Sequence, residues 1–320
     1  MRTPAFRTIT FACLCALSIL ILSCKKKSDT PVTSATYSSL ADFYAKNGVQ
    51  SQFFNVDAVA GGSFTTPQGT KVTISPNSFV DLSNNPVSGT VRIEFKDIYK
   101  KSDMLMTDIP PMLGNGAPLV SGGEFFIRAQ QTNSADSLFL NLAKNKFIVV
   151  QQPLNGKPDT AMKPFVLVPD STAAQIWQAR QMDTVSELSN GYVFALYNFS
   201  SPVGKGTWCN SDNSTYFSAY KNTTLTLIPD FTESDYSADV FLIFKGLNSM
   251  VHIYYDGVSQ FPYYYAPIGL SCTVVVVGTK NNNLYGSFTP ITISANQTVN
   301  IPISQITTAD FKNKLTALDN

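Results

Sequence analysis

The chain alternates apolar and polar residues over short stretches that are separated by turn-forming residues, and this pattern constrains its fold more than any other feature. Successive side chains of a strand point to opposite faces, so a period of two is typical of β-structure buried on one face. Turn-forming runs such as Ser83-Asn84-Asn85-Pro86 separate the stretches. The first set of predicted strands covers residues 52–56, 70–75, 90–98, 124–130, 138–142 and 147–151.

A second set of alternating stretches follows a segment rich in Gly, Pro, Ser and Asn. These strands are predicted at residues 223–228, 238–244, 251–255, 273–277 and 298–303. Residues 272–277 are apolar almost throughout, which is typical of a strand buried on both faces. Strands at this spacing without helices between them favour antiparallel sandwiches. The sequence therefore predicts an all-β fold with two β-sandwich domains in tandem.

Two short helices are predicted at the ends of this β-structure. Residues 39–46 carry apolar side chains at helical spacing and stop at Asn47-Gly48. Near the end of the chain, Thr307 and Asp310 make a start that resembles a capping box, and Phe311, Leu315 and Leu318 share one face. We expect a short N-terminal helix before the first sandwich and a C-terminal helix that docks on a sandwich.

The N-terminal residues predict export and lipid attachment. Arg2 and Arg7 precede an apolar run at residues 11–22 that is too short for a stable membrane-spanning helix, as in a cleaved signal peptide. The run ends in Ile21-Leu22-Ser23-Cys24, which resembles a bacterial lipobox. The resemblance implies that Cys24 is lipidated after residues 1–23 are removed. We therefore expect an outer-membrane protein with a lipid anchor on the periplasmic or the cell-surface side.

These patterns give a predicted domain organisation. After the signal peptide (1–23) come a flexible tether (24–37), a first β-sandwich domain with its leading helix (38–201), a linker (202–220) and a second β-sandwich domain with the C-terminal helix (221–320). The tether begins with three lysines and continues in Ser, Thr and Pro, a composition typical of a mobile linker.

Charge and composition exclude several classes of function. Only 14% of the 320 residues are charged, the formal net charge is +1, and loss of residues 1–23 leaves 21 basic against 22 acidic residues. Nucleic-acid binding needs a clustered basic surface, and the chain has no basic run outside its N-terminal region. The single His, His252, argues against His-based metal sites and His-dependent catalysis. We expect no nucleic-acid partner, no cofactor and no metal.

Two cysteines, Cys209 and Cys272, remain in the mature chain besides Cys24. Disulfides form readily in exported proteins, so a bridge between the two predicted domains is one expectation. The other expectation is that the two cysteines are separate buried thiols, and the sequence does not decide between these alternatives.

One stretch resembles a known family. Residues 69–79 followed by residues 86–93 resemble the opening of ZU5-like domains, in which a strand, a proline turn and a second strand begin a β-sandwich. The resemblance extends, over roughly residues 50–212, to a group of Bacteroidota lipoproteins. Asp103-Met104-Leu105, the run at 119–124 and Trp208-Cys209-Asn210-Ser211-Asp212 belong to it, although the last departs from the Asn-Cys-Asp triplet of that group. It implies a sandwich used for binding or scaffolding, and no catalytic residues.

Catalysis is not expected. Some ZU5-like domains cleave themselves at His-Phe-Ser, but Asn198-Phe199-Ser200 has no base at the first position. His252 alternates with apolar neighbours and is interpreted as a half-buried strand residue. Glu124, after two glycines, is the first acid to inspect, and we expect it to face solvent at the start of a strand.

A non-catalytic binding or scaffolding role in the envelope is therefore the predicted function, with the membrane and an envelope protein as expected partners. The alternative is a surface glycan-binding lipoprotein, because six aromatics gather around the turn at residues 254–265. The candidate contacts are Tyr255, Asp256, Tyr263, Tyr264 and Tyr265. Exposed Tyr rings with polar neighbours can stack on sugars, although packing between the domains would explain the same residues.

Overall fold

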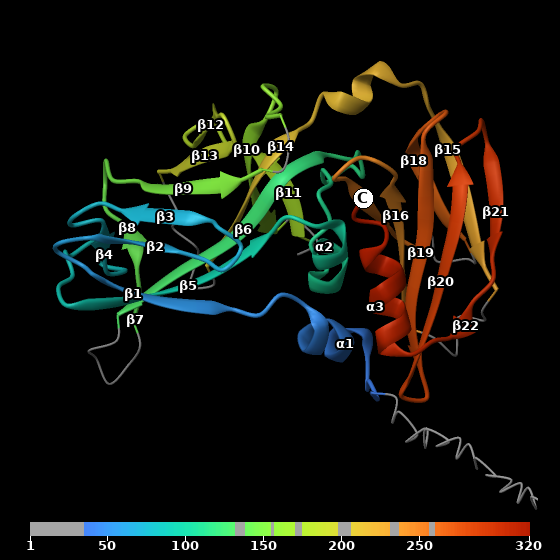
Figure 1. Ribbon diagram of the computed structural model, residues 1–320, viewed down its shortest axis with the longest axis horizontal. Helices are drawn as coiled ribbons and strands as arrows, with labels where there is room; N and C mark the ends of the chain where they lie inside the picture. Colours follow the sequence, from blue (N-terminus) through green and yellow to red (C-terminus); the bar gives the residue numbers. More distant parts are fainter. Residues whose placement is uncertain are drawn as a thin grey trace, which may run out of the picture. The chain divides into compact units, whose positions relative to one another are not determined.

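The computed structural model describes residues 35–131, 138–154, 157–169, 175–197, 206–230, 237–255 and 260–320 (Figure 1). These residues form mostly strands, arranged in five sheets, together with three α-helices. The predicted all-β class is therefore confirmed, as are the two sandwiches and the short helix at each end. Among the described residues, no helix is both long enough and apolar enough to cross a membrane.

The first sandwich consists of a seven-stranded and a five-stranded antiparallel sheet. The larger sheet has the order β1-β5-β6-β14-β10-β11, with β7 paired to β6, and the smaller has the order β12-β13-β9-β3-β2. The larger contains β1 (Gln52–Asp57), β5 (Thr90–Ile98), β6 (Val120–Gln131), β7 (Leu138–Phe139), β10 (Lys163–Pro169), β11 (Gln175–Ala179) and β14 (Thr207–Asn213). The smaller contains β2 (Gly62–Thr65), β3 (Lys71–Ile74), β9 (Ile148–Pro153), β12 (Thr184–Leu188) and β13 (Gly191–Leu196). A separate pair joins β4 (Phe79–Val80) and β8 (Asn141–Leu142).

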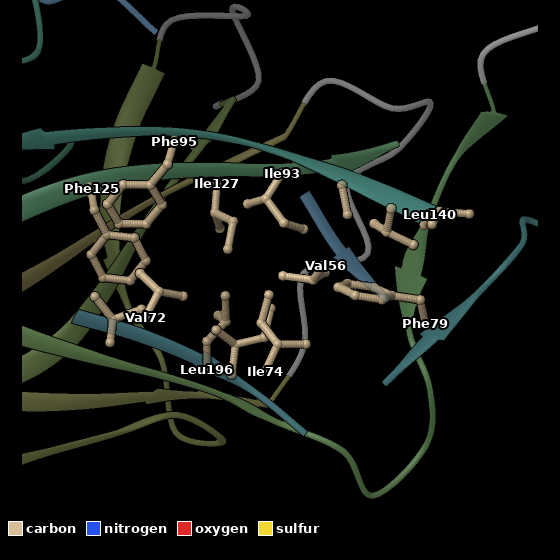
Figure 2. Packing of buried hydrophobic residues seen from close by; sticks show 14 of the residues in the cluster. Val56, Val72, Ile74, Phe79, Ile93, Phe95, Phe125, Ile127, Leu140 and Leu196 are labelled. Carbon is tan, nitrogen blue, oxygen red and sulfur yellow. The ribbon is translucent and has the colours of Figure 1, made fainter. Parts of the chain in front are cut away.

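The core of this sandwich follows directly from the period of two. On β5 the alternate residues Val91, Ile93 and Phe95 are buried, and the predicted bounds of this strand match the structure to the residue. Figure 2 shows Ile93 and Phe95 pointing toward Val72 and Ile74 of the facing sheet. Burial of this one face stabilises the sandwich, because each apolar side chain removed from water contributes about 1.5–3 kcal/mol.

The second sandwich packs a three-stranded sheet on a five-stranded sheet. Their orders are β18-β15-β21 and β17-β16-β19-β20-β22. The strands are β15 (Asn222–Pro229), β16 (Ser237–Phe244), β17 (Met250–Ile253), β18 (Phe261–Pro267), β19 (Ser271–Lys280), β20 (Asn283–Thr292), β21 (Gln297–Ile301) and β22 (Ser304–Gln305). The pairing of β15 with β21 is parallel, unlike every other strand pair among the described residues.

Three helices cover the outer face of the five-stranded sheet of the second sandwich. They are α1 (Leu40–Asn47), α2 (Lys101–Thr107) and α3 (Thr308–Thr316). Phe43 and Phe311 pack edge to face, with ring centroids 5.8 Å apart, in a cluster that also contains Val275 and Val277 of β19. Val274 and Val276 face the opposite way, into the sandwich core. The apolar run 272–277 is thus buried on both faces, as its composition predicts.

The N-terminal and C-terminal helices begin as expected from their sequences. Ser39 caps α1 by accepting a hydrogen bond from the Asp42 amide, and Thr307 caps α3 by accepting one from the Asp310 amide, each at 3.1 Å. Phe311 and Leu315 are buried on the face that the spacing indicates. The caps satisfy amide groups that a helix start would otherwise leave unpaired.

Two parts of the fold differ from the sequence-based expectation. Helix α2 was not predicted, because it has only seven residues and its N-cap residue, Lys100, makes no side-chain capping bond. The predicted linker at 202–220 contains β14, which pairs with both β6 and β10. The first strand set therefore continues to Asn213, beyond the predicted boundary at residue 201.

Candidate functional site

A polar cleft of about 600 Å³ opens at the start of β6. It collects residues from the first strand set, from the turn between β16 and β17, and from the end of α3. The lining residues are Gln68, Tyr99, Lys100, Ser121, Gly122, Pro153, Leu154, Asn248, Thr316, Asp319 and Asn320. Amide, hydroxyl, ammonium and carboxylate groups thus meet in one concave surface together with apolar groups, and small-ligand sites combine apolar walls with convergent polar groups.

Two glycines at the start of β6 allow aromatic rings to pack against the strand beside the cleft. Gly123 has a φ of +132°, and a Cβ atom on it would lie 2.4 Å from Cε1 of Tyr99. A Cβ atom on Gly122 would lie 2.8 Å from Cε2 of Tyr192. Both positions therefore require glycine, the first for its backbone conformation as well as for space.

Tyr99 is held by a buried polar network centred on Asp97. The hydroxyls of Thr66 and Thr70 each donate to Oδ2 of Asp97 at 2.6 Å, and Gln52 donates to Oδ1 at 2.9 Å. The hydroxyl of Tyr99 lies 2.6 Å from that of Thr70. Burial raises the pKa of Tyr99, so the phenol stays neutral in the cleft wall. A network in which each carboxylate oxygen is bonded fixes the ring in one position.

Further hydrogen bonds fix the remaining walls. The amide of Ser121 donates to the Asn248 carbonyl at 2.8 Å, and the Asn248 side chain donates back to the Ser121 carbonyl at 2.9 Å. Asp319 accepts from the amide and the hydroxyl of Ser102, at 2.9 and 2.7 Å, at the start of α2. The cleft is therefore preformed, which lowers the entropy cost of binding a ligand.

The predicted aromatic platform is only partly assembled. Tyr263 is 4% exposed and packs in the second sandwich core, so it is not available to a surface ligand. Tyr264 is 65% exposed, whereas Tyr255 and Tyr265 pack at the margin of the core. The register of β18 against β15 shifts between Tyr263 and Ala266, and Tyr264 is the exposed ring at this irregularity. Asp256 lies outside the described residues.

The cysteines do not form the bridge that was one expectation. Cys209 and Cys272 are free thiols, buried in the cores of the first and the second sandwich respectively. Burial raises the pKa of both thiols, that of Cys272 to about 12, so neither is a reactive thiolate at neutral pH. Cys24 and Asn198-Phe199-Ser200 lie outside the described residues.

The prediction that Glu124 faces solvent is wrong. Its side chain is 0% exposed, as is that of Asp212 on the neighbouring strand β14. The expectation failed because a strand start was assumed to lie at an open edge, whereas β6 lies between β5 and β14 in the sheet. A glycine pair before an acid was the sequence signal for this position, but nothing in the sequence alone indicates what covers it.

His252 is half-buried on β17, as expected, and has neighbours that the sequence does not reveal. Its Nε2 atom lies 3.2 Å from Asp239 Oδ1, and its Nδ1 atom lies 3.7 Å from Asp108 Oδ1. The Tyr44 hydroxyl donates to Asp239 Oδ2 at 2.6 Å. The imidazole packs between the rings of Phe241 and Tyr254, so this cluster joins elements that are far apart in the sequence.

The comparisons with known proteins give no further assignment. No family model matches the chain, and no curated protein matches it. The likeness of residues 69–93 to ZU5-like domains therefore stays a prediction from the sequence. The geometry of the described residues offers a preformed polar cleft, and its lining groups suit hydrogen bonding to a polar ligand.

Proposed function

We propose that this protein is an extracytoplasmic lipoprotein of the outer membrane that binds a hydroxyl-rich ligand, such as a glycan, without catalysis. Its anchor is Cys24, and its binding site is the cleft at the start of β6. The lining of the cleft is the single observation that carries the proposal. Neutral donors and acceptors, one ammonium group and one carboxylate match the hydroxyls of a sugar better than an apolar or a strongly charged ligand.

Individual cleft residues have distinct roles in this proposal. Lys100 is exposed at the rim and can donate to a ligand. The side-chain nitrogen of Asn248 donates to the Ser121 carbonyl. This bond holds the Asn248 side chain in place and so fixes the direction of its Oδ1 atom, which can accept from a ligand. The ring of Tyr99, held by Thr70, offers an apolar surface on which a sugar ring can stack.

A glycan array tests this site. The mature chain with Cys24→Ser, which removes the acyl anchor, is compared with the same chain carrying Lys100→Glu. We expect the parent to bind a subset of glycans and Lys100→Glu to weaken that binding about tenfold or more, because a hydrogen bond to a charged group is lost. Lys71→Glu is the matched control, since Lys71 is exposed on β3 and does not line the cleft.

Two results would contradict the cleft assignment. One is a parent chain that binds no glycan, and the other is an equal affinity of the Lys100 and Lys71 variants. Crosslinking in intact envelopes would then test the remaining alternative, in which the chain scaffolds an envelope protein.

The exposed ring of Tyr264 is a second candidate site for glycan binding. Its ring is 65% exposed on β18, and Tyr254 is 57% exposed. Tyr264→Ala in the same array should leave glycan binding unchanged if the cleft is the site. A loss confined to Tyr264→Ala would assign the ligand to the β18 surface instead.

The lipid anchor is tested independently of the ligand. Cys24→Ala should move the protein from the membrane fraction to the soluble fraction, because acyl chains contribute about 0.8 kcal/mol of membrane affinity for each buried CH₂. A Cys24→Ala chain that stays in the membrane fraction would exclude this anchor. Cys209→Ala serves as the control, since that thiol is buried in the first core.

A further inference from the structure

Glu124 and Asp212 form a pair of buried carboxylates on adjacent strands. Both side chains are 0% exposed. Glu124 on β6 lies opposite Asn210 on β14, and Asp212 is two residues beyond Asn210, so the three side chains share one face of the sheet. This pair is separate from the lining of the cleft.

Most of the oxygens of this pair receive no hydrogen bond from the protein. Oε1 of Glu124 accepts from Nδ2 of Asn210 at 3.2 Å, and Oδ1 of Asn210 accepts from the Ser121 hydroxyl at 2.7 Å. Among the described residues, no donor reaches Oε2 of Glu124 or either oxygen of Asp212. Buried polar atoms are nearly always bonded, so three such oxygens in one place need an explanation.

No positive side chain among the described residues forms an ion pair with either carboxylate. Burial and the neighbouring charge of Asp212 raise the pKa of Glu124, and burial raises the pKa of Asp212. A buried charge without a partner is strongly unfavourable. Either the two acids hold protons, or a cation that the protein itself does not supply neutralises them.

We propose that a hard divalent cation of the Ca²⁺ class binds between Glu124 and Asp212. The two positive charges of the ion balance the two carboxylates, which leaves the site neutral. Oε2 of Glu124 and the two oxygens of Asp212, which receive no hydrogen bond from the described residues, are the hard ligands that Ca²⁺ prefers. Ca²⁺ takes about six to eight oxygen ligands, so main-chain carbonyls or water would have to complete the set.

This position gives the ion a structural role. β6 and β14 are central strands of the larger sheet, and their register shifts between Asn210 and Asp212. An ion held by one acid from each strand fixes that irregular pairing. Ca²⁺ suits it better than Mg²⁺, because Ca²⁺ accepts irregular coordination whereas Mg²⁺ demands a near-ideal octahedron.

Thermal unfolding with and without metal tests the site in the mature chain carrying Cys24→Ser. After removal of metal with a chelator, addition of about 1 mM CaCl₂ should raise Tm by about 5 °C or more, because an ion that binds only the folded state stabilises it. Elemental analysis of the purified parent chain should find about one calcium per chain. In the Glu124→Gln, Asp212→Asn double variant the rise in Tm should disappear.

Asp97→Asn is the matched control. Its carboxylate is equally buried but is bonded by Thr66, Thr70 and Gln52, so this variant should keep the calcium-dependent rise whatever its own Tm. A rise of equal size in the double variant would place the ion elsewhere and overturn the proposal. A parent chain with no bound metal and no rise in Tm would overturn it even if the variants fail to fold, and would indicate a protonated pair.

Discussion

Two separate features of the structure require glycine at position 123, its backbone conformation and the packing of a neighbouring ring. Its φ of +132° is rarely adopted by other residues, and the ring of Tyr99 occupies the space that a Cβ atom would need. The position of Tyr99 in the cleft wall thus depends on the absence of a single methyl group. A glycine pair in a predicted strand indicates such a close approach, but it does not identify the partner.

Gly123→Ala should destabilise the protein by roughly 2–4 kcal/mol, through backbone strain and the displacement of Tyr99. Urea unfolding measures this change. Gly246→Ala is the control, because Gly246 also has a positive φ, +72°, but no atom lies within 4 Å of the position of its Cβ. We expect about 1–2 kcal/mol there from the backbone alone. Equal losses at the two positions would contradict the role assigned to the Tyr99 ring.

Helices α1 and α3 stabilise each other although they lie at opposite ends of the described chain. The hydroxyl of Tyr37, just before α1, lies 2.8 Å from that of Thr308. Phe311 of α3 packs against Phe43 and Phe288, and a Cβ atom on Gly286 would lie 3.1 Å from its ring. Phe311 therefore connects both helices to β20.

Phe311→Ala should cost about 3–5 kcal/mol, the usual loss for a fully buried Phe. Chemical denaturation followed by circular dichroism measures this loss. Phe53→Ala is the comparison, since Phe53 is 51% exposed and its ring contacts Arg92, so we expect a loss of only about 1 kcal/mol or less. A small effect at Phe311 would mean that α3 contributes little to the fold.

The strands with regular alternation, such as β5, could be predicted from the sequence, and so could the capped helices α1 and α3. Strand β14 could not, because its sequence, with Asn210, Ser211 and Asp212, has the composition of a loop. Asn210 and Ser211 are buried because their partners come from other strands, as Gln152 of β9 does for Ser211 at 2.6 Å. The cleft could not be predicted for the same reason, since its walls come from residues more than 200 positions apart.

The cluster around His252 joins α1, the end of α2 and the second sandwich. Burial and the charge of Asp239 raise the pKa of Asp108 to about 6, although His252 acts against this rise. Burial also acts to raise the pKa of Asp239, but His252 and the Tyr44 hydroxyl outweigh it and hold that pKa below its ordinary value. The two carboxylates therefore respond to pH in opposite ways.

An acid whose pKa is raised by folding destabilises the protein when it is ionised, so the unfavourable contribution of Asp108 is present above about pH 6 and fades as the pH falls toward 4. We expect Asp108→Asn to become more stable relative to the parent as the pH rises from about 5 to 8. Urea unfolding at several pH values measures this trend. A relative stability that does not change with pH would contradict it.

Asp239→Asn provides the opposite comparison. Folding lowers the pKa of Asp239, so its ionised carboxylate stabilises the folded protein at pH values above about 4, the pKa in the unfolded chain. This stabilisation is lost as the pH falls through the lower pKa of the folded state. This variant should lose about 1 kcal/mol or more at pH 7, and the loss should shrink below about pH 4. A loss that grows with acidity would reverse the assignment of the two acids.

The position of β19 between two cores has a consequence for the order in which parts of the molecule open. One face of the strand contacts the sandwich interior and the other contacts the helices, through Val274 and Val276 on one side and Val275 and Val277 on the other. Release of the helices alone leaves the first face covered, and separation of the sheets leaves the second covered. We expect exchange of the β19 amides with solvent deuterium to require both events, and β16, with Val240 in one core and Phe241 in the other, to exchange equally slowly.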